Sequence, residues 1–273
     1  MTFGGRLFYC ENPMASNPPQ ESMKESIRGL NKAHYATETN FYTTAPLRPI
    51  EQHLVTNLST SARILDVGCG AARVTAAMTR MGFRITGVDV VRECLESARR
   101  SFPELSLDLV EGDMCKLPFD DGEFNEVLCL RFSFNALGTE EERFQALHEM
   151  VRVCAPGGRI LVESFNRLYP GKLGLMWLAN FADEVSRSLR IAAGSLSPRL
   201  PKGDILYLAS KDRNAVPGYA HLPTPLELKR IANIIPSKVH FEILSAEAVA
   251  SYPEVFWKRW FGYSIWLRGL MPQ

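Results

Sequence analysis

Residues 64–73 read Ile-Leu-Asp-Val-Gly-Cys-Gly-Ala-Ala-Arg and carry the strongest indication of the fold. The apolar run that opens this stretch predicts a buried strand, and the glycines at 68 and 70 predict a tight turn into a helix. An acid, Asp66, stands just before the first glycine. In α/β proteins this order brings bare backbone close to a nucleoside-type ligand.

Two side chains of this stretch argue against a dinucleotide as the ligand. A dinucleotide loop carries a third glycine three positions after the second, and here that position is Arg73. The carboxylate of Asp66 would repel a pyrophosphate and suits a ligand with a cationic group. The turn therefore indicates a nucleoside-type ligand that is neither NAD nor FAD.

The pattern on both sides of this stretch predicts a doubly wound α/β fold. Strands are predicted at 63–67, 84–88, 105–110, 124–130 and 158–164. Helices are predicted at 46–58, 72–81, 91–101 and 139–153. Alternation of this kind implies right-handed crossovers and a parallel sheet covered on both faces. Two further strands, at 239–244 and 263–267, would close the sheet after a helix that begins near Thr224.

The expected organisation is a short leader followed by one domain. Residues 1–30 are expected to form a flexible leader, since glycines and prolines break their pattern. Within the domain 31–273 we expect an N-terminal lid at 31–60, a Rossmann-like core at 61–165 and a lid insertion at 166–222. A closing helix and strands would occupy 223–273. The insertion is longer than ordinary connections, which favours a functional role. It contains one helix-like stretch, 173–193.

Composition sets limits on the function. The chain has 273 residues and a formal net charge of +1, so overall charge gives no reason to expect nucleic acid as a partner. The six cysteines show neither zinc-ligand spacing nor a secreted disulfide framework. We find no signal-peptide pattern and no transmembrane run, which predicts a cytoplasmic protein.

Two further acids stand where successive predicted strands end. Asp89 ends the strand after the glycine turn, at the distance where an acid hydrogen-bonds ribose hydroxyls. Asp113 follows the third strand and could accept a hydrogen bond from an exocyclic amine, while the amide of Met114 could donate to a ring nitrogen. A surface or turn acid is the alternative at each position.

Taken together and in order, these motifs resemble the class I S-adenosylmethionine-dependent methyltransferase family, in its small-molecule subgroup of ubiquinone- and glycine-methyltransferase type. The resemblance covers roughly residues 50–165. It rests on the segments 64–73, 87–89, 111–114, 117–119, 124–130 and 152–161. It implies a seven-stranded, mostly parallel sheet whose last hairpin is antiparallel, which the two closing strands fit.

The resemblance also implies which residues hold S-adenosylmethionine. Asp66 would face the methionine amino group, Asp89 the ribose hydroxyls, and Asp113 with Met114 the adenine edge. Arg73 would reach the methionine carboxylate or, equally, form a salt bridge within the fold. The complete cofactor set is Asp66, Gly68, Cys69, Gly70, Arg73, Asp89, Val90, Asp113, Met114 and Leu130.

The chemistry implied is an in-line S_N2 attack on the sulfonium methyl group, yielding S-adenosylhomocysteine. Alignment of the reacting atoms can contribute about 7–11 kcal/mol to such a step. Neither a metal nor a covalent nucleophile is required. We expect no metal site, since no carboxylate cluster suggests one.

The acceptor is expected at the carboxyl edge of the sheet, over residues 131–137. This segment resembles that of small-molecule methyltransferases and favours an apolar or aromatic metabolite. The expected acceptor-binding residues are Tyr42, Arg131, Phe132, Ser133, Asn135 and Trp177. The candidate catalytic residues are Tyr35 and His221. Tyr35, on the N-terminal lid, would close over the cofactor and the acceptor. His221, at the end of the insertion, is the candidate base, because histidine is matched to base chemistry near neutral pH. A structural role is the alternative for both.

Two other functions remain open at this point. The segments 117–119, 140–143 and 155–158 also resemble transfer-RNA methyltransferases of the wobble-uridine type, although the His-His pair of that group is missing. The aromatic and basic run 256–261 would suit a non-catalytic, membrane-peripheral protein or, alternatively, a packing or dimer contact. A monomer or a homodimer is expected.

Overall fold

The computed structural model describes residues 20–37, 39, 43, 45–169, 203–207, 216–235, 238–252 and 256–273. These residues form a seven-stranded sheet in the order β3-β2-β1-β4-β5-β9-β8. The strands are β1 (Arg63–Val67), β2 (Arg84–Asp89), β3 (Asp108–Glu111), β4 (Phe124–Cys129), β5 (Cys154–Phe165), β8 (His240–Ser245) and β9 (Ser264–Leu270).

The sheet is parallel except at one end. The pairs from β3 through β5 are parallel, and β9 runs antiparallel to both β5 and β8. The predicted α/β sheet with an antiparallel final hairpin is therefore confirmed. Because β1 and β2 are parallel neighbours, with Val67 beside Val88 in register, their carboxyl ends meet at one edge of the sheet.

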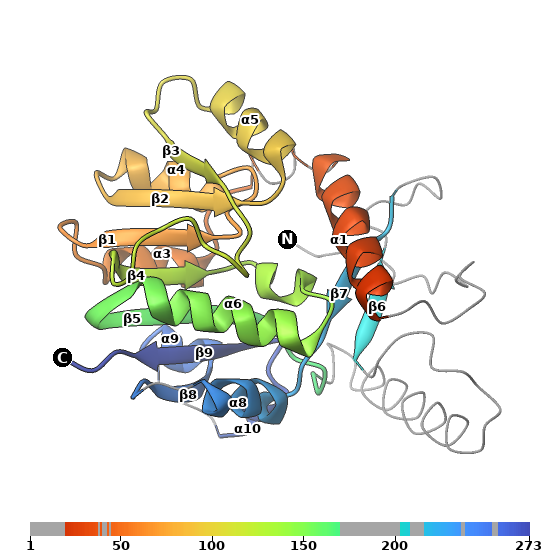
Figure 1. The fold of residues 1–273 in the computed structure, drawn as a ribbon. Coiled ribbons are helices and arrows are strands. Elements are labelled where there is room, and N and C mark those ends of the chain that lie inside the picture. The colour runs from red at the N-terminus through yellow and green to blue at the C-terminus, as the bar shows by residue number, and fades with distance from the viewer. Residues whose placement is uncertain are drawn as a thin grey trace, which may run out of the picture.

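Helices cover both faces of the sheet (Figure 1). One face packs against α6 (Glu140–Val153) and α8 (Pro225–Ile234). The other packs against α3 (Pro49–Thr56), α4 (Arg73–Arg80) and the short α9 (Ala246–Val249), and α5 (Arg92–Ser101) packs beside β2 and β3. Alternate residues of a strand point to opposite faces, so neighbouring apolar residues of each buried strand enter different cores.

Capping boxes mark where two of these helices begin. Thr139 accepts from the Glu142 amide at the start of α6, and Thr224 accepts from the Glu227 amide at the start of α8. In each box the glutamate side chain returns to the backbone of the capping threonine. These contacts satisfy amides that would otherwise lack a partner at the helix start.

The N-terminal part differs from the sequence expectation. The first helix, α1 (Gln20–Thr37), begins inside the segment expected to be a flexible leader. Leader residues of this helix make tertiary contacts, since Ile27 is buried and Arg28 bonds Asp113 and Glu142, and α1 packs on β7 (Gly218–His221). Figure 1 shows α1 standing across the carboxyl ends of the parallel strands.

Part of the expected insertion forms a second, two-stranded sheet of β6 (Asp204–Tyr207) and β7. The helix predicted at 173–193 lies outside the described residues. The run 256–261 forms the short helix α10 (Phe256–Phe261). The proposed division of the chain into leader, lid, core and insertion stays a prediction.

Candidate functional site

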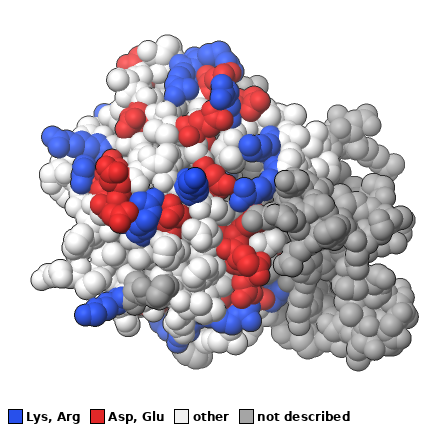
Figure 2. All heavy atoms as spheres, in the orientation of Figure 1, with Lys and Arg blue, Asp and Glu red and all other residues white. Residues whose placement is uncertain are grey.

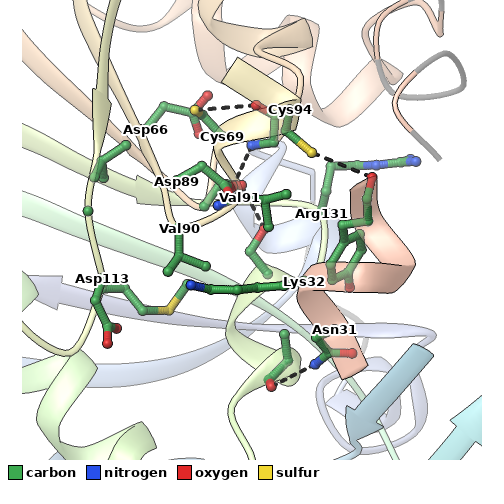
Figure 3. A pocket seen from close by; sticks show the side chains of 18 of the residues that line it. Asn31, Lys32, Asp66, Cys69, Asp89, Val90, Val91, Cys94, Asp113 and Arg131 are labelled. Carbon is green, nitrogen blue, oxygen red and sulfur yellow. Dashed lines mark hydrogen bonds between the residues drawn. The ribbon is translucent and has the colours of Figure 1, made fainter. Parts of the chain in front are cut away.

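A cavity of about 610 Å³ lies at the carboxyl edge of the sheet, beneath α1. Every residue predicted to hold the cofactor lines it, as do the predicted Tyr35, Arg131 and Ser133. Figure 3 shows Asp66, Asp89 and Asp113 along one side of the cavity and Asn31 and Lys32 of α1 on the other. The volume is in the range usual for small-molecule sites.

The glycine turn forms the floor of the cavity. Gly68 adopts a φ of 71° and Gly70 a φ of 55°, a region that disfavours side chains. A Cβ on Gly68 would lie 2.5 Å from the Cβ of Ser133, whose hydroxyl donates to the Gly68 carbonyl at 2.9 Å. A Cβ on Gly70 would meet open space. Gly68 is thus required by protein packing, whereas Gly70 leaves room for a ligand.

Asp89 is held by the backbone of the turn. Its carboxylate accepts from the Gly70 amide at 2.7 Å and from the Val91 amide at 2.9 Å. Burial raises the pKa of Asp89, although these backbone hydrogen bonds oppose the shift. Since an ionised carboxylate has about four acceptor positions, Asp89 can still accept hydrogen bonds from a ligand.

Asp66 is the most deeply buried acid in the cavity wall. Its side chain is 3% exposed and accepts a hydrogen bond from the Thr75 hydroxyl at 2.8 Å. Burial raises its pKa to about 6. A cationic ligand group placed beside it would favour the ionised carboxylate.

Asp113 lies at the other end of the row of acids. It accepts from the Cys115 amide at 2.9 Å and from the Arg28 guanidinium at 2.8 Å. Arg28 belongs to α1, so this helix reaches an acid of the cavity directly. No local pattern predicts this contact, because the two residues are 85 positions apart in the sequence.

Arg73 forms a buried salt bridge, the second of the two roles considered for it. Its guanidinium donates to both carboxylate oxygens of Glu51 on α3, at 2.8 and 2.6 Å. Burial alone would raise the pKa of Glu51, but Arg73 and Arg48 together hold it below its ordinary value. Arg73 lines the cavity with its charge already paired.

The Arg73–Glu51 ion pair belongs to a larger network of charged side chains that was not predicted from the sequence. Arg48 contacts Glu51 and also donates to the fully buried Glu163 of β5, at 2.7 Å. Glu163 in turn accepts from the Arg131 amide at 2.9 Å. Arg131 and Phe132 both have positive φ, of 54° and 66°. The network therefore fixes a strained turn at the cavity wall.

Two predicted acceptor-binding residues, Phe132 and Asn135, lie outside the cavity lining. Phe132 stacks on Phe165, with ring centroids 3.6 Å apart. Asn135 is 1% exposed, and its amide bonds Ser164, the Phe165 amide and the His221 carbonyl. These contacts use the hydrogen-bonding capacity of Asn135 within the protein.

His221 is buried in the small sheet. Its Nδ1 lies 2.5 Å from Asp204, the residue directly opposite on β6. This pair joins the two strands rather than facing the cavity. The remaining two predicted residues, Tyr42 and Trp177, lie outside the described part of the chain.

Tyr35 connects the cavity with the small sheet. Its hydroxyl lies 3.2 Å from the hydroxyl of Tyr207 on β6. The ring of His34 meets both tyrosine rings edge to face, with centroids 5.1 Å apart. Aromatic side chains from α1 and β6 thus meet beside the cavity.

Cysteine or metal chemistry finds no support in the described residues. The five cysteines there are unpaired. Burial raises the pKa of Cys94 to about 12 and that of Cys69 well above its ordinary value, which makes both poor nucleophiles. No group of three or more metal-ligating side chains occurs in the described ranges.

A Rossmann-like sheet with acids at successive strand ends around one cavity defines a protein that binds a nucleoside-type ligand. Residues 64–158 match the family described as "Methyltransferase domain". The chain is 30% identical over 187 residues to a demethylmenaquinone methyltransferase of Thermus thermophilus, covering 67% of this chain and 77% of that protein. The chain belongs to the class I S-adenosylmethionine-dependent methyltransferase family.

Other similarities agree with this family. A ubiquinone biosynthesis O-methyltransferase of Alkalilimnicola ehrlichii is 30% identical over 108 residues, or 38% of this chain and 42% of that protein. This match covers 42% of the relative's length. Two further matches, to a putative methyltransferase of Bacillus subtilis and a demethylmenaquinone methyltransferase of Clavibacter sepedonicus, cover 49% and 41%, so the chain spans less than half of these relatives. The CcbJ methyltransferase of Streptomyces caelestis shares the fold, with a TM-score of 0.60 and 15% identity over 89% of this chain and 99% of that one.

Proposed function

We propose that this chain transfers a methyl group from S-adenosylmethionine to a small apolar or aromatic acceptor. The observation that carries the proposal is the carboxylate of Asp89, bonded to the Gly70 amide at the edge of a cavity that also contains Asp66 and Asp113. An acid in this position can accept hydrogen bonds from ribose hydroxyls. The nucleobase and the cationic group of the ligand need further acceptors on either side of this acid.

The residues present fit this cofactor. Open space beside Gly70 admits a ligand close to the backbone. Asp66 is a buried carboxylate that a cationic methionine amino group would stabilise in its ionised form. Asp113 accepts hydrogen bonds only, which suits an exocyclic amine, and the side chains of Val90 and Met114 supply apolar surface for a nucleobase.

S-adenosylmethionine, when bound, supplies an activated methyl group and a neutral thioether as the leaving group. The task of the protein is then to align the acceptor and to exclude water. The helix α1 covers the cavity with Asn31, Lys32 and Tyr35. The buried network through Glu163 holds the turn at Arg131, so the wall on that side is rigid.

We place the acceptor next to Tyr35 and Ser133 in the cavity wall. Apolar side chains dominate much of the remaining lining, including Val74, Leu130 and Leu137, which supports an apolar acceptor. His221 is bonded to Asp204 away from this lining, so we assign it the role of holding the small sheet and Asn135 in position. Tyr35 remains our candidate for contact with the reacting centre.

The two other functions receive less support. Figure 2 shows positive and negative side chains interspersed on the visible face, without the broad basic surface that nucleic acid favours. In α10, Lys258 is paired with Glu247 at 2.7 Å and Arg259 also has a partner, which leaves less charge for an anionic membrane. Among the described helices, none is long and apolar enough to cross a membrane.

Activity measurements with several acceptors test the proposal. The full chain is incubated with S-adenosylmethionine and either a demethylated quinone or a catechol-type phenol, and S-adenosylhomocysteine is measured. The proposed reaction predicts product that depends on the acceptor and is lost in Asp89→Ala. Binding of S-adenosylhomocysteine without turnover of any apolar acceptor, but with methylation of bulk transfer RNA, would contradict the proposed acceptor class.

A further inference from the structure

The helix α1 contributes a cation to the acid at the nucleobase end of the cavity. Arg28 donates from Nη1 to Asp113 at 2.8 Å and from Nε to Glu142 at 2.5 Å. The side chain of Glu142 is 1% exposed, whereas that of Asp113 is 33% exposed. One guanidinium therefore joins a buried acid to an acid of the cavity wall.

The Glu142 carboxylate that holds Arg28 is itself held in place by the backbone. It accepts from the amides of Gly138 and Thr139 at the start of α6. A guanidinium presents its N–H groups in a fixed plane, so bonding to Glu142 determines where the remaining N–H groups point. Arg28 then orients Asp113, whose second oxygen is held by the Cys115 amide.

The position of α1 is set by other contacts on the same helix. Asn31 donates to the Ala136 carbonyl at 3.0 Å and accepts from the Tyr219 amide at 2.8 Å. The Nδ1 of His34 lies 2.8 Å from the Val216 carbonyl. With α1 held in this way, Asn31 and Lys32 lie at the cavity (Figure 3), and Arg28 on the same helix reaches Asp113.

We propose that Arg28 is a positioning residue that makes nucleobase selectivity depend on the placement of α1. The inference rests on the proposed function, in which Asp113 accepts from the exocyclic amine of adenine. An ionised, oriented carboxylate favours an amine and disfavours a carbonyl at the same ring position, because two acceptors repel each other. Without Arg28, only the Cys115 amide would hold the Asp113 carboxylate, and Asp113 would discriminate less.

Calorimetry with two ligands tests this selectivity. The full chain is titrated with S-adenosylhomocysteine and with its deaminated analogue S-inosylhomocysteine, which carries a carbonyl in place of the amine. We expect the wild type to prefer S-adenosylhomocysteine by about tenfold or more, the value of one hydrogen bond to a charged group. Arg28→Gln should lower this preference at least threefold, and Arg28→Lys should give an intermediate ratio because it keeps the charge without the planar fork.

Arg80→Gln is the matched control. Arg80 forms a comparable ion pair with Glu104, at 2.6 Å, and neither residue lines the cavity. This variant should keep the wild-type affinities for both ligands. Circular dichroism verifies that each variant is folded, and Arg28→Lys keeps the test usable if Arg28→Gln is not.

The outcomes are distinct. An equal loss of affinity for both ligands in the Arg28 variants would mean that Arg28 only stabilises α1, and the inference would be wrong. Tighter binding of S-adenosylhomocysteine by Arg28→Gln would also overturn it, since Arg28 would then compete for Asp113. Failure of the wild type to bind S-adenosylhomocysteine would contradict the proposed function itself.

Discussion

The carboxylate of Asp89 accepts hydrogen bonds from the Gly70 and Val91 amides and also faces the cavity. Asp89→Ala should weaken S-adenosylhomocysteine binding by about 3 kcal/mol or more, because hydrogen bonds to a charged group and the shape of the turn are lost together. Calorimetry measures the effect. Asp108→Asn is the control, as it changes an acid that bonds Thr86 away from the cavity. Equal affinity in the wild type and Asp89→Ala would refute the ribose assignment.

Gly68 permits a second test of the same turn. Gly68→Val should abolish S-adenosylhomocysteine binding, since its Cβ would clash with Ser133 and its φ of 71° is unfavourable for a β-branched residue. Calorimetry and circular dichroism together separate lost binding from lost folding. Retained affinity in a folded Gly68→Val protein would show that the turn does not form the ligand site.

The pKa of Asp66 leads to a prediction of how ligand binding depends on pH. Its pKa is raised to about 6 by burial, so the carboxylate is ionised above pH 6 and protonated below. A cationic amino group prefers the ionised form, and affinity for S-adenosylhomocysteine should therefore fall as the pH is lowered through 6, by at most about tenfold per pH unit. Calorimetry between pH 5 and 8 measures this dependence. Asp66→Asn should remove it, and a pH-dependent loss that persists in this variant would assign the effect to another group.

Asp66, Asp89 and Asp113 could be predicted to lie together because each stands at or just after the end of a predicted strand of a parallel sheet, and the structure places all three around one cavity. Strand ends meet at one edge, so their side chains could be placed together before the structure was known. Arg28 could not be found in this way, since its role depends on where α1 packs. Two roles stayed open for Arg73, a contact to the methionine carboxylate and a salt bridge, because its partner Glu51 lies on another helix.

Among the secondary-structure elements, α3, α4 and β5 are joined by the network of Arg73, Glu51, Arg48 and Glu163. Glu163→Ala should reduce the free energy of unfolding by about 3–5 kcal/mol, since it leaves Arg48 without its main partner inside the protein. The double variant Arg48→Leu, Glu163→Leu should lose less than the single one. Urea unfolding measures both.

Exposed ion pairs provide the comparison for this network. Glu104→Ala removes the partner of Arg80 at the surface, where both side chains are about half exposed, and should leave stability unchanged. A similarly small effect of Glu163→Ala would show that the network does not support the wall of the cavity. Loss of stability in the double variant as large as in the single one would point instead to a packing defect.

Elements with a regular pattern were predicted well, and elements defined by tertiary contact were not. The strands and helices of the core follow from periodicity and capping boxes, which are local signals. The strands β6 and β7 pair with each other in the part of the chain that the structure describes, and at four residues each they are too short for a pattern that distinguishes them from loops. The packing of α1 against β7 likewise brings together segments far apart in the sequence, and no local signal announces it.

The chain carries a formal net charge of +1, and among the described residues several arginines and lysines are paired with acids. We expect no salt-dependent binding to anionic vesicles, because Lys258 and Arg259 in the aromatic helix α10 already have partners. Co-sedimentation at low and high salt tests this expectation. Binding at low salt that disappears in Trp257→Ala, whose side chain is 65% exposed, would instead support a membrane-facing role for α10.

We claim that the cavity beneath α1 holds the nucleoside of S-adenosylmethionine. A crystal structure of the full chain with S-adenosylhomocysteine tests it most directly. We predict the ribose hydroxyls on Asp89, the adenine amine on Asp113 and the methionine amino group beside Asp66. S-adenosylhomocysteine bound elsewhere, or in this cavity without contact to Asp89, would contradict the claim.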